Sequence, residues 1–389
     1  MKKTMLLLIG LLLTWGSYAQ SDFKILYGPY LQMMGENEVT VMWVTNKEAV
    51  SWVEVAPDDQ SHFYAEERPR SFQTNFGKKL VGKLHAIRVT GLKKGTSYRY
   101  RIYSKEVMEQ TPYYVQYGKV AASNVYTKKP YRFTTLDKEK DHITFKMVND
   151  IHENSDVMAS LLRTVREQNC DFVLFNGDMM NNMASEEQIF SGFMNEATNL
   201  FATEIPVFFA RGNHETRGMF STEYIHYFPT STGQPYYAFQ EGPAYFIVLD
   251  GGEDKPDTDI EYWELAAFDQ YRANEVNWLK EVLSSEAFIR SPFKIVIMHV
   301  PPVNSSWHGP LEVKKHFLPL LNEAGIDLML CGHLHTYQYV PAGKGDCNFP
   351  ILINSNTHVV DVDITTTQLQ LKVKDADQKL FKEFTFQRK

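Results

Sequence analysis

Two different patterns of hydrophobic and polar residues divide the chain. Between residues 22 and 136, short runs of β-branched and aromatic residues alternate with turn-forming residues such as Gly35, Pro57 and Gly95. About seven such runs in roughly 110 residues are typical of a β-sandwich. The clearest runs are 39–44, 51–55, 85–89, 98–103 and 113–117. The first part of the chain is therefore predicted to be an all-β sandwich domain spanning residues 22–136.

The pattern changes after a charged connector at residues 136–141, which we take as the domain boundary. From residue 142 to residue 389, apolar runs of strand length alternate with stretches of helical periodicity, and this alternation predicts an α/β domain with buried strands. The expected strands are 143–148, 172–175, 207–210, 245–249, 293–298 and 327–330, with a return to β structure over 351–387. The expected helices lie near 157–167, 186–201, 273–283 and 313–324.

The N-terminus has the pattern of a secretory signal peptide. Lys2 and Lys3 precede an apolar run over residues 5–13, and small residues at Ser17 and Ala19 then suit a signal peptidase. The apolar run is too short to span a bilayer, and no later run is long enough for a transmembrane helix. We therefore expect cleavage after about Ala19, so that residues 1–19 are removed, and export to the periplasm or the medium, with no transmembrane segment.

Composition and charge narrow the choice of partners. The chain is 43% hydrophobic and 22% charged, which is ordinary for a globular protein, and its formal net charge is −7. Without residues 1–19, 38 basic residues face 47 acidic ones, which gives a net charge of −9. A chain this acidic is a poor candidate for binding nucleic acid. Its three cysteines are too few for a disulfide scaffold, although Cys331 and Cys347 could pair.

Polar residues that can bind metals follow five of the expected strands. In α/β sheets, ligands bind at the carboxyl ends of the strands, so these five ends can converge on one crevice. Side chains two positions apart on an extended backbone point the same way, which would turn both members of each spaced pair toward one site. Imidazole and carboxylate ligands together suit Zn, Mn or Fe. The strand ends are Asp150-Ile151-His152, Gly177-Asp178, Gly212-Asn213-His214-Glu215, His299 and Gly332-His333-Leu334-His335.

These five motifs, in this order, resemble the calcineurin-like metallophosphoesterase superfamily. The resemblance implies a domain of two β-sheets packed face to face with helices outside, a four-layer α-β-β-α arrangement. It also implies two divalent or transition metal ions that share the carboxylate of Asp178. The implied ligands are Asp150, His152, Asp178 and His335 for one metal ion, and Asp178, Asn213, His299 and His333 for the other.

The predicted sandwich carries a second resemblance. Residues 28–32, 91–98 and 133–135 resemble the fibronectin-type-III-like domain that precedes the catalytic domain of purple acid phosphatases. One position departs from that family, because Asn181 stands where its members carry a tyrosine that ligates ferric iron. An obligatory ferric centre is therefore not expected, and the metal ions could be Fe, Mn or Zn.

The resemblance implies an exported two-metal phosphoesterase. A hydroxide that bridges the two metal ions would attack phosphorus, and His214, a histidine that is not a ligand, would protonate the leaving group as general acid. His308 lies nine residues after His299, where purple acid phosphatases carry a histidine that contacts the substrate, so His308 and Asn213 are expected to bind the phosphate. The expected substrate is a small phosphate ester, with monoesters favoured.

Other interpretations remain open at this point. The same metal core would serve a phosphodiesterase or a nucleotidase, and an inactive α/β domain would leave a surface-binding module whose sandwich contacts a glycan or a protein. Arg211 could bind a phosphate oxygen or form a structural ion pair, and we favour the ion pair. Asp250 is a candidate partner for His214. The acidic and aromatic insert 253–272 could form a wall of the substrate cleft or cover the edge of a sheet.

Overall fold

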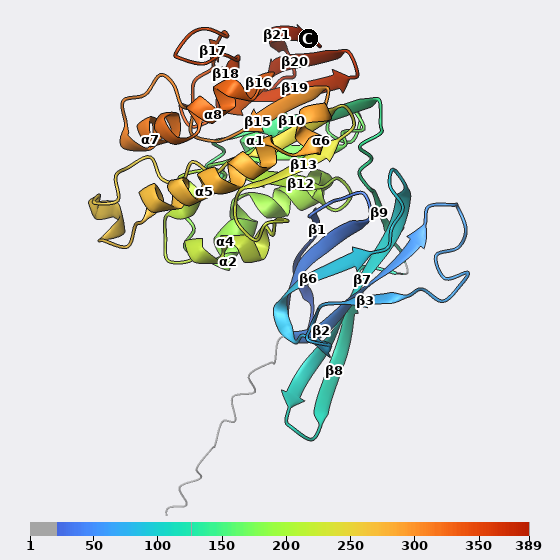
Figure 1. Cartoon of the computed structure of the whole chain (residues 1–389). Helices are drawn as coiled ribbons and strands as arrows, with labels where there is room; N and C mark the ends of the chain where they lie inside the picture. The colour runs from blue at the N-terminus through green and yellow to red at the C-terminus, as the bar shows by residue number, and fades with distance from the viewer. Residues whose placement is uncertain (1–21, 126, 389) are drawn as a thin grey trace, which may run out of the picture.

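The computed structural model describes residues 22–125 and 127–388, which form a β-rich N-terminal part beside a larger α/β part (Figure 1). The expected signal peptide, residues 1–19, lies outside the described residues. Within the described part of the chain, none of the helices combines the length and the apolar character that crossing a membrane requires.

The N-terminal part is built on two long strands, β2 (Glu38–Pro57) and β7 (Ser97–Gln110). The first half of β2 pairs with β1 (Ile25–Gln32) and β6 (Gly82–Thr90), while its second half pairs with β3 (Arg70–Phe72) and β7. The sequence pattern had predicted two separate strands here. They form one continuous strand, whose partner changes from β6 to β7 near Ala49. The other strands are β8 (Val115–Ala122) and β9 (Tyr131–Thr134), both paired with β7, and the small hairpin β4 (Thr74–Asn75) and β5 (Lys78–Lys79).

The C-terminal part contains two six-stranded sheets. The first runs in the order β12 (Val207–Ala210), β11 (Phe172–Asn176), β10 (His142–Val148), β19 (His358–Thr365), β20 (Gln368–Asp375) and β21 (Leu380–Gln387). The second runs in the order β13 (Tyr237–Glu241), β14 (Ala244–Val248), β15 (Phe293–Ile297), β16 (Leu328–Cys331), β18 (Ile351–Ile353) and β17 (Gln338–Val340). The strands β10, β11 and β12 are parallel, as are β14, β15, β16 and β18. Two of these strands, β13 and β17, were not expected from the sequence.

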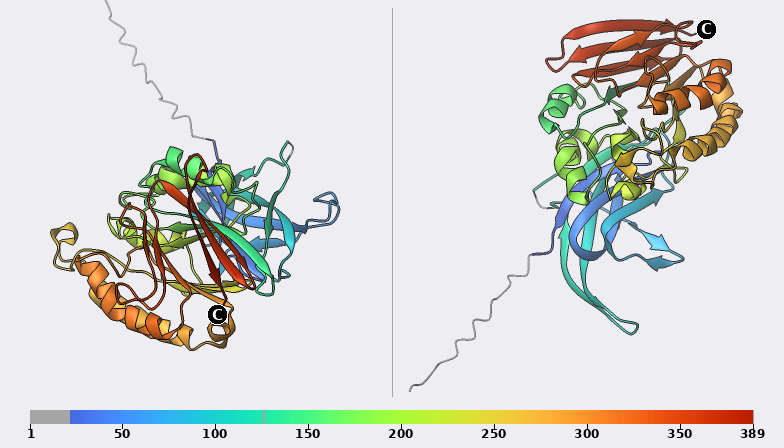
Figure 2. Two further views of the ribbon diagram at one scale, coloured as in Figure 1. Left: turned by 90° about the horizontal axis from the view of Figure 1, so that it is seen from above. Right: turned by 90° about the vertical axis from the view of Figure 1, so that its left-hand side faces the viewer.

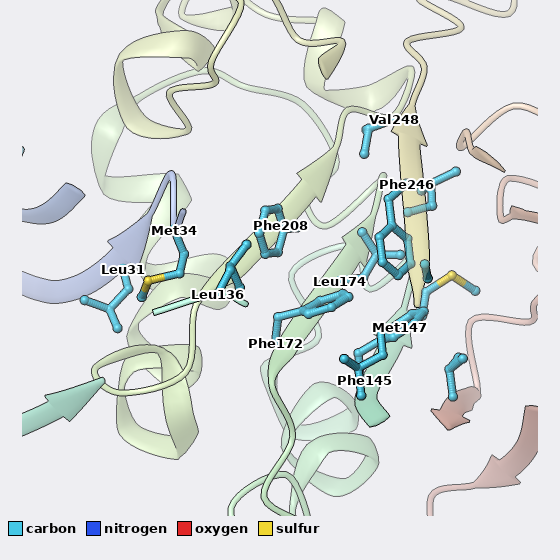
Figure 3. Close-up of a cluster of buried hydrophobic side chains, with 14 of the residues drawn as sticks. Leu31, Met34, Leu136, Phe145, Met147, Phe172, Leu174, Phe208, Phe246 and Val248 are labelled. Atoms are coloured by element: carbon cyan, nitrogen blue, oxygen red, sulfur yellow. The ribbon is translucent and has the colours of Figure 1, made fainter. Parts of the chain in front are cut away.

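Aromatic side chains fill the space between the two sheets (Figure 3). Phe172 of the first sheet stacks on Phe145 at 4.6 Å between ring centroids, and it meets Phe246 of the second sheet edge-on at 5.5 Å. All three side chains are buried. The helices cover the outside of the two sheets (Figures 1 and 2). The expected fold, a β-rich domain followed by a layered α/β domain, is confirmed.

The helices differ in their ends from the sequence-based expectation. Helix α5 (Phe268–Leu283) begins five residues early, because the Asp257 carboxylate accepts the N–H groups of Phe268 and Asp269. The helix expected over 313–324 is two helices, α7 (His308–His316) and α8 (Leu318–Glu323), since Pro319 can start a helix but not continue one. The others are α1 (Ser155–Leu162), α6 (Glu286–Arg290), α4 (Tyr224–Tyr227) and a helical stretch over 186–202 in which α2 (Glu186–Ile189) and α3 (Asn195–Ala197) alternate with π-turns.

The two parts of the chain share their hydrophobic core. One cluster of buried side chains runs from Leu31 and Trp43 of the N-terminal sheet through Leu136 to the aromatic residues between the two C-terminal sheets. Two buried tyrosines add hydrogen bonds across the junction: Tyr30 donates to the carbonyl of Tyr227 at 3.0 Å, and Tyr100 donates to that of Thr203 at 2.6 Å. The boundary between residues 136 and 142 remains a prediction.

Glu241 lies buried at this junction and gives a prediction about pH. Its carboxylate accepts the Asp137 N–H at 2.7 Å, and burial raises its pKa from 4.5 to about 8. Between these values the folded protein holds a proton that the unfolded chain releases, so the free energy of unfolding should fall as the pH rises. Glu241→Gln keeps the hydrogen bond without the titration. We expect its melting temperature to exceed that of the wild type increasingly from about pH 5 to about pH 8. The control is Glu167→Gln, a substitution at an exposed position. A difference in melting temperature between Glu241→Gln and the wild type that does not change with pH would contradict the prediction.

Candidate metal centre

The structure brings the predicted metal ligands together where the carboxyl ends of the two sheets meet. Strands β10, β11 and β12 of the first sheet lead to the loops that contribute Asp150, His152, Asp178 and Asn213, whereas β15 and β16 of the second sheet lead to His299, His333 and His335. Two groups form, each with potential ligand atoms within 4.8 Å of one another, and Asp178 belongs to both. The first contains Asp150, His152, Asp178 and His335, and the second contains Asp178, His299 and His333.

The prediction that the spaced pairs of ligands lie on extended backbone is wrong. Asp150 and His152 have φ angles of 54° and 48°, and His333 and His335 have φ angles of 73° and 55°, so these residues are left-handed rather than extended. The loop after β10 is held by the loop after β11, where the Asp150 N–H donates to the Gly177 carbonyl at 2.9 Å. Each such residue costs about 1–3 kcal/mol of strain, which the surrounding loops must offset.

Two buried atoms show that a cation fits this site. His299 donates its Nδ1 hydrogen to the Asn176 carbonyl at 2.7 Å, which directs Nε2 toward the carboxylates. Both His299 Nε2 and Asp150 Oδ1 are buried, and neither makes a hydrogen bond of ordinary geometry, although His299 Nε2 lies 3.0 Å from Asp178 Oδ2 and Asp150 Oδ1 lies 3.3 Å from His335 Nε2. Although burial alone would lower it, the pKa of His299 is raised to about 10 by Asp178 and Asp150. A positive charge is therefore favoured between these groups.

The first group has the same character. The Nε2 atoms of His152 and His335 lie 3.2 Å apart, and His335 Nε2 lies 3.3 Å from Asp150 Oδ1. Burial lowers the pKa of His152, whereas the close approach of the Asp150 carboxylate raises the pKa of His335. Imidazole nitrogens and carboxylate oxygens that converge in this way form a donor set suited to Zn, Mn or Fe.

Asn213 and Glu215 hold the second group in place. The Asn213 side-chain oxygen lies 3.0 Å from His333 Nδ1, so the expected amide ligand is adjacent to the histidine with which it was grouped. The carboxylate of Glu215, which is fully buried, accepts the N–H groups of Asp178 at 2.9 Å and Gly212 at 2.9 Å. Glu215 therefore ties the loop after β11 to the loop after β12, a positioning role that its place in the motif did not reveal.

Two glycines are required by close packing rather than by a turn alone. A Cβ atom on Gly212 would lie 2.2 Å from Asp178 Oδ1, and a Cβ atom on Gly177 would lie 2.4 Å from His299 Nδ1. Only Gly177 of these two has a left-handed φ angle, of 79°. The absence of a side chain at both positions lets the backbone lie directly against groups of the site.

A cleft of about 610 Å³ opens beside the two groups. His214 lies in its wall, where the ring donates its Nδ1 hydrogen to the Asn181 carbonyl at 2.6 Å, and the His214 backbone N–H donates to Asp178 Oδ1 at 2.9 Å. Asp250, the candidate partner of His214, instead pairs with Arg211 at 2.7 Å, which also identifies Arg211 as a structural ion-pair residue. The cleft is lined by Asp178, Asn213, His214, Arg217, Asp254, Lys255, Asn304, Ser305, Ser306, Trp307, His333, Leu334 and His335.

His308 does not line this cleft with the other described residues, although its neighbour Trp307 does. It begins helix α7, and its Nε2 lies 2.8 Å from Asp269 Oδ1 of helix α5. A direct phosphate contact by His308 would require the ring to leave Asp269.

The first residues of the insert after β14 form part of the cleft wall, one of the two roles considered for the insert. Asp254 and Lys255 of the insert line the cleft, and the buried carboxylate of Glu253 holds Arg217. Sequence reasoning missed Arg217 and Glu253, because they lie 36 residues apart and their pairing leaves no local signal.

Three comparisons with known proteins agree with this geometry. Residues 143–337 match the calcineurin-like phosphoesterase family model, which is half of the chain. Purple acid phosphatase 18 of Arabidopsis thaliana is 25% identical over 346 residues, which cover 83% of this chain and 69% of that protein. An acid phosphatase of Aspergillus ficuum is 31% identical over 85 residues, 21% of this chain and 14% of the relative.

The structural comparison covers both parts of the chain. The structure of a purple acid phosphatase from yellow lupin seeds (Lupinus luteus) matches 92% of this chain and 74% of its own, with a TM-score of 0.67 and 14% sequence identity. This similarity extends the likeness beyond the catalytic half to the N-terminal sheet and to the order of the two parts.

Proposed function

Because the chain belongs to the calcineurin-like phosphoesterase family and is a metal-dependent phosphatase, we propose that it hydrolyses phosphate monoesters outside the cytoplasm. The observation that carries this proposal is the pair of metal-capable groups that share Asp178 beside an open cleft. The similarity to plant purple acid phosphatases supports the monoester preference, and the expected signal peptide over residues 1–19 supports export.

In this proposal each group holds one metal ion, and Asp178 contributes to both. Asp150, His152 and His335 would complete the first site, and His299, His333 and Asn213 the second. When bound, a pair of Fe, Mn or Zn ions supplies a water of low pKa and offsets the charge of the phosphate. Residues 142–389 would thus provide all the ligands, and residues 22–136 would form a domain that is free to contact a glycan or a protein.

The protein's own side chains would position the ester and move a proton. His214 is proposed as the general acid, because its Nδ1 is fixed on the Asn181 carbonyl and Nε2 is the ring atom left to carry a proton to the leaving oxygen. Asn213 is proposed to contact the phosphate as well as a metal ion, since it lines the cleft. His308 would join them only after its ring leaves Asp269.

A panel of esters tests this proposal directly. The metal-reconstituted protein would be assayed with p-nitrophenyl phosphate, bis(p-nitrophenyl) phosphate, nucleotides, sugar phosphates and phosphopeptides. We expect higher kcat/KM for monoesters than for the diester. A preference for the diester would favour the phosphodiesterase alternative, and a preference for nucleotides alone would favour a nucleotidase. No hydrolysis with Mn, Zn or Fe would favour an inactive catalytic domain.

The metal content gives a separate prediction. We expect close to two transition-metal ions per chain after reconstitution, because two groups of ligands are present and share one carboxylate. Elemental analysis of the dialysed protein is the measurement, with kcat followed as each metal is titrated. Full activity with at most one metal ion per chain would contradict the two-metal arrangement.

A further inference from the structure

Arg217 reaches the cleft from the loop after β12, and four polar contacts to three residues fix its side chain. Its Nε and one terminal nitrogen donate to the two oxygens of Glu253 at 2.8 and 2.7 Å, a bidentate pair with a fully buried carboxylate. The same terminal nitrogen lies 3.2 Å from Asp254 Oδ1. The other terminal nitrogen, NH1, lies 3.2 Å from His214 Nε2. Glu253 and Asp254 therefore hold the guanidinium in place, and its NH1 nitrogen is left for the cleft that Arg217 lines.

The hydrogen bonds determine the form of the His214 ring. A carbonyl oxygen can only accept, so the contact with Asn181 places a hydrogen on His214 Nδ1. An arginine nitrogen can only donate, so the contact with Arg217 requires a lone pair on His214 Nε2. Arg217 therefore contacts the ring nitrogen of His214 that the Asn181 carbonyl leaves free.

NH1 has a second hydrogen that can reach an anion in the cleft. It carries two hydrogens, and the structure shows one hydrogen bond for it, to His214. A charged N–H donor bonds strongly to a terminal phosphate oxygen and weakly to an ester oxygen. A phosphate monoester has three terminal oxygens, whereas a diester has two, so a donor fixed at this place discriminates between them.

We propose that Arg217, held by Glu253 beside His214, binds a terminal oxygen of the substrate phosphate and so favours phosphate monoesters over diesters. This inference rests on the proposed phosphatase function and adds the residue that would set its substrate class.

Two other cationic side chains, those of Arg211 and Lys255, lie near the cleft. Neither is held beside His214 as Arg217 is. Arg211 is paired with Asp250 beneath the site, with only 12% of its side chain exposed, and it does not line the cleft. Lys255 lines the cleft but pairs loosely with Glu261 at 3.4 Å, and its contacts do not include His214. Lys255 is therefore a matched control, a cleft cation without the fixed position.

The test compares Arg217→Gln and Arg217→Lys with Lys255→Gln. For Arg217→Gln we expect kcat/KM for p-nitrophenyl phosphate to fall by roughly 10–100-fold, the size of a lost charged hydrogen bond, and kcat/KM for bis(p-nitrophenyl) phosphate by less than about threefold. Calorimetry with inorganic phosphate on the metal-loaded protein should show a similar roughly 10–100-fold weakening. Arg217→Lys keeps a charge for Glu253 but cannot span both contacts, so it should lose most of the discrimination while folding normally. Lys255→Gln should leave the ratio of kcat/KM for the two esters unchanged, because Lys255 lacks the fixed position beside His214.

The outcomes separate this inference from the function on which it rests. Equal losses on both esters, or unchanged phosphate binding in both Arg217 variants, would overturn the role of Arg217 while leaving the phosphatase intact. A wild-type protein that hydrolyses neither ester would overturn the proposed function instead, and phosphate calorimetry would still decide whether Arg217 binds the anion.

Discussion

Asp178→Asn is expected to abolish activity, because Asp178 is the residue common to both metal groups. The amide keeps the shape of the side chain and still accepts the His214 N–H, but it removes the charge that two cations would share. The carboxylate is buried 3.0 Å from His299, and although burial opposes ionisation, that histidine keeps the pKa of Asp178 below its usual range. Enzymes of this kind supply accelerations of at least about 10⁶-fold, and most of that factor should be lost.

The measurement is metal content beside kcat for the wild type and Asp178→Asn. Metal content should fall from two ions per chain to one or fewer, whereas circular dichroism should show a folded protein. The control is Asp363→Asn on strand β19, where Asp363 forms a half-exposed ion pair with His142 of strand β10. This variant should keep both metals and full activity. Asp178→Asn with two bound metal ions and a kcat near that of the wild type would refute the bridging assignment.

His214→Ala is expected to separate metal binding from chemistry. The ring is not part of either metal group, and its Nδ1 is occupied by the Asn181 carbonyl, so its removal should leave both ions in place. The lost proton transfer should lower kcat for alkyl phosphates by roughly 10²–10⁴-fold. The loss should be smaller for p-nitrophenyl phosphate, because its leaving group needs little protonation.

His333→Ala gives the matched comparison, since His333 belongs to the second metal group and should lose metal and activity together. Both variants would be assayed for metal content and for kcat on an alkyl and an aryl phosphate. If His214→Ala loses a metal ion, or slows both substrates equally, the general-acid assignment does not hold.

The sequence predicted the α/β strands well because buried parallel strands are short continuous apolar runs. The strand over 207–210 has the predicted ends, and β10, β11 and β15 differ by one residue at an end. Metal-capable residues were also recognisable, because each follows such a run. The sequence could not predict the backbone conformation of the loops. The left-handed conformation of Asp150 or His333 depends on hydrogen bonds to another loop, such as the one from the Asp150 N–H to Gly177, and not on the residue itself.

Contacts between distant segments account for the residues that sequence reasoning missed. Arg217 follows the recognised motif, but its position depends on Glu253, which lies in the insert. The early start of helix α5 depends on Asp257, eleven residues before Phe268. Strand β13 was missed because Tyr237–Glu241 carries partly exposed residues and pairs with β14 at the edge of a sheet, where alternation is weak. His308 was placed by analogy of spacing, and its ring contacts Asp269.

The hydrophobic core that crosses the junction between the two parts makes the protein hard to divide into separate fragments. Trp43, Leu31 and Leu136 belong to the same buried cluster as the aromatic residues between the catalytic sheets. A chain cut at the connector would expose these apolar surfaces to water on both fragments, and exposed surfaces of this kind promote aggregation. The N-terminal part thus covers apolar surface of the catalytic part. Grafting the metal-binding half onto another protein would require that its β-rich companion be carried along.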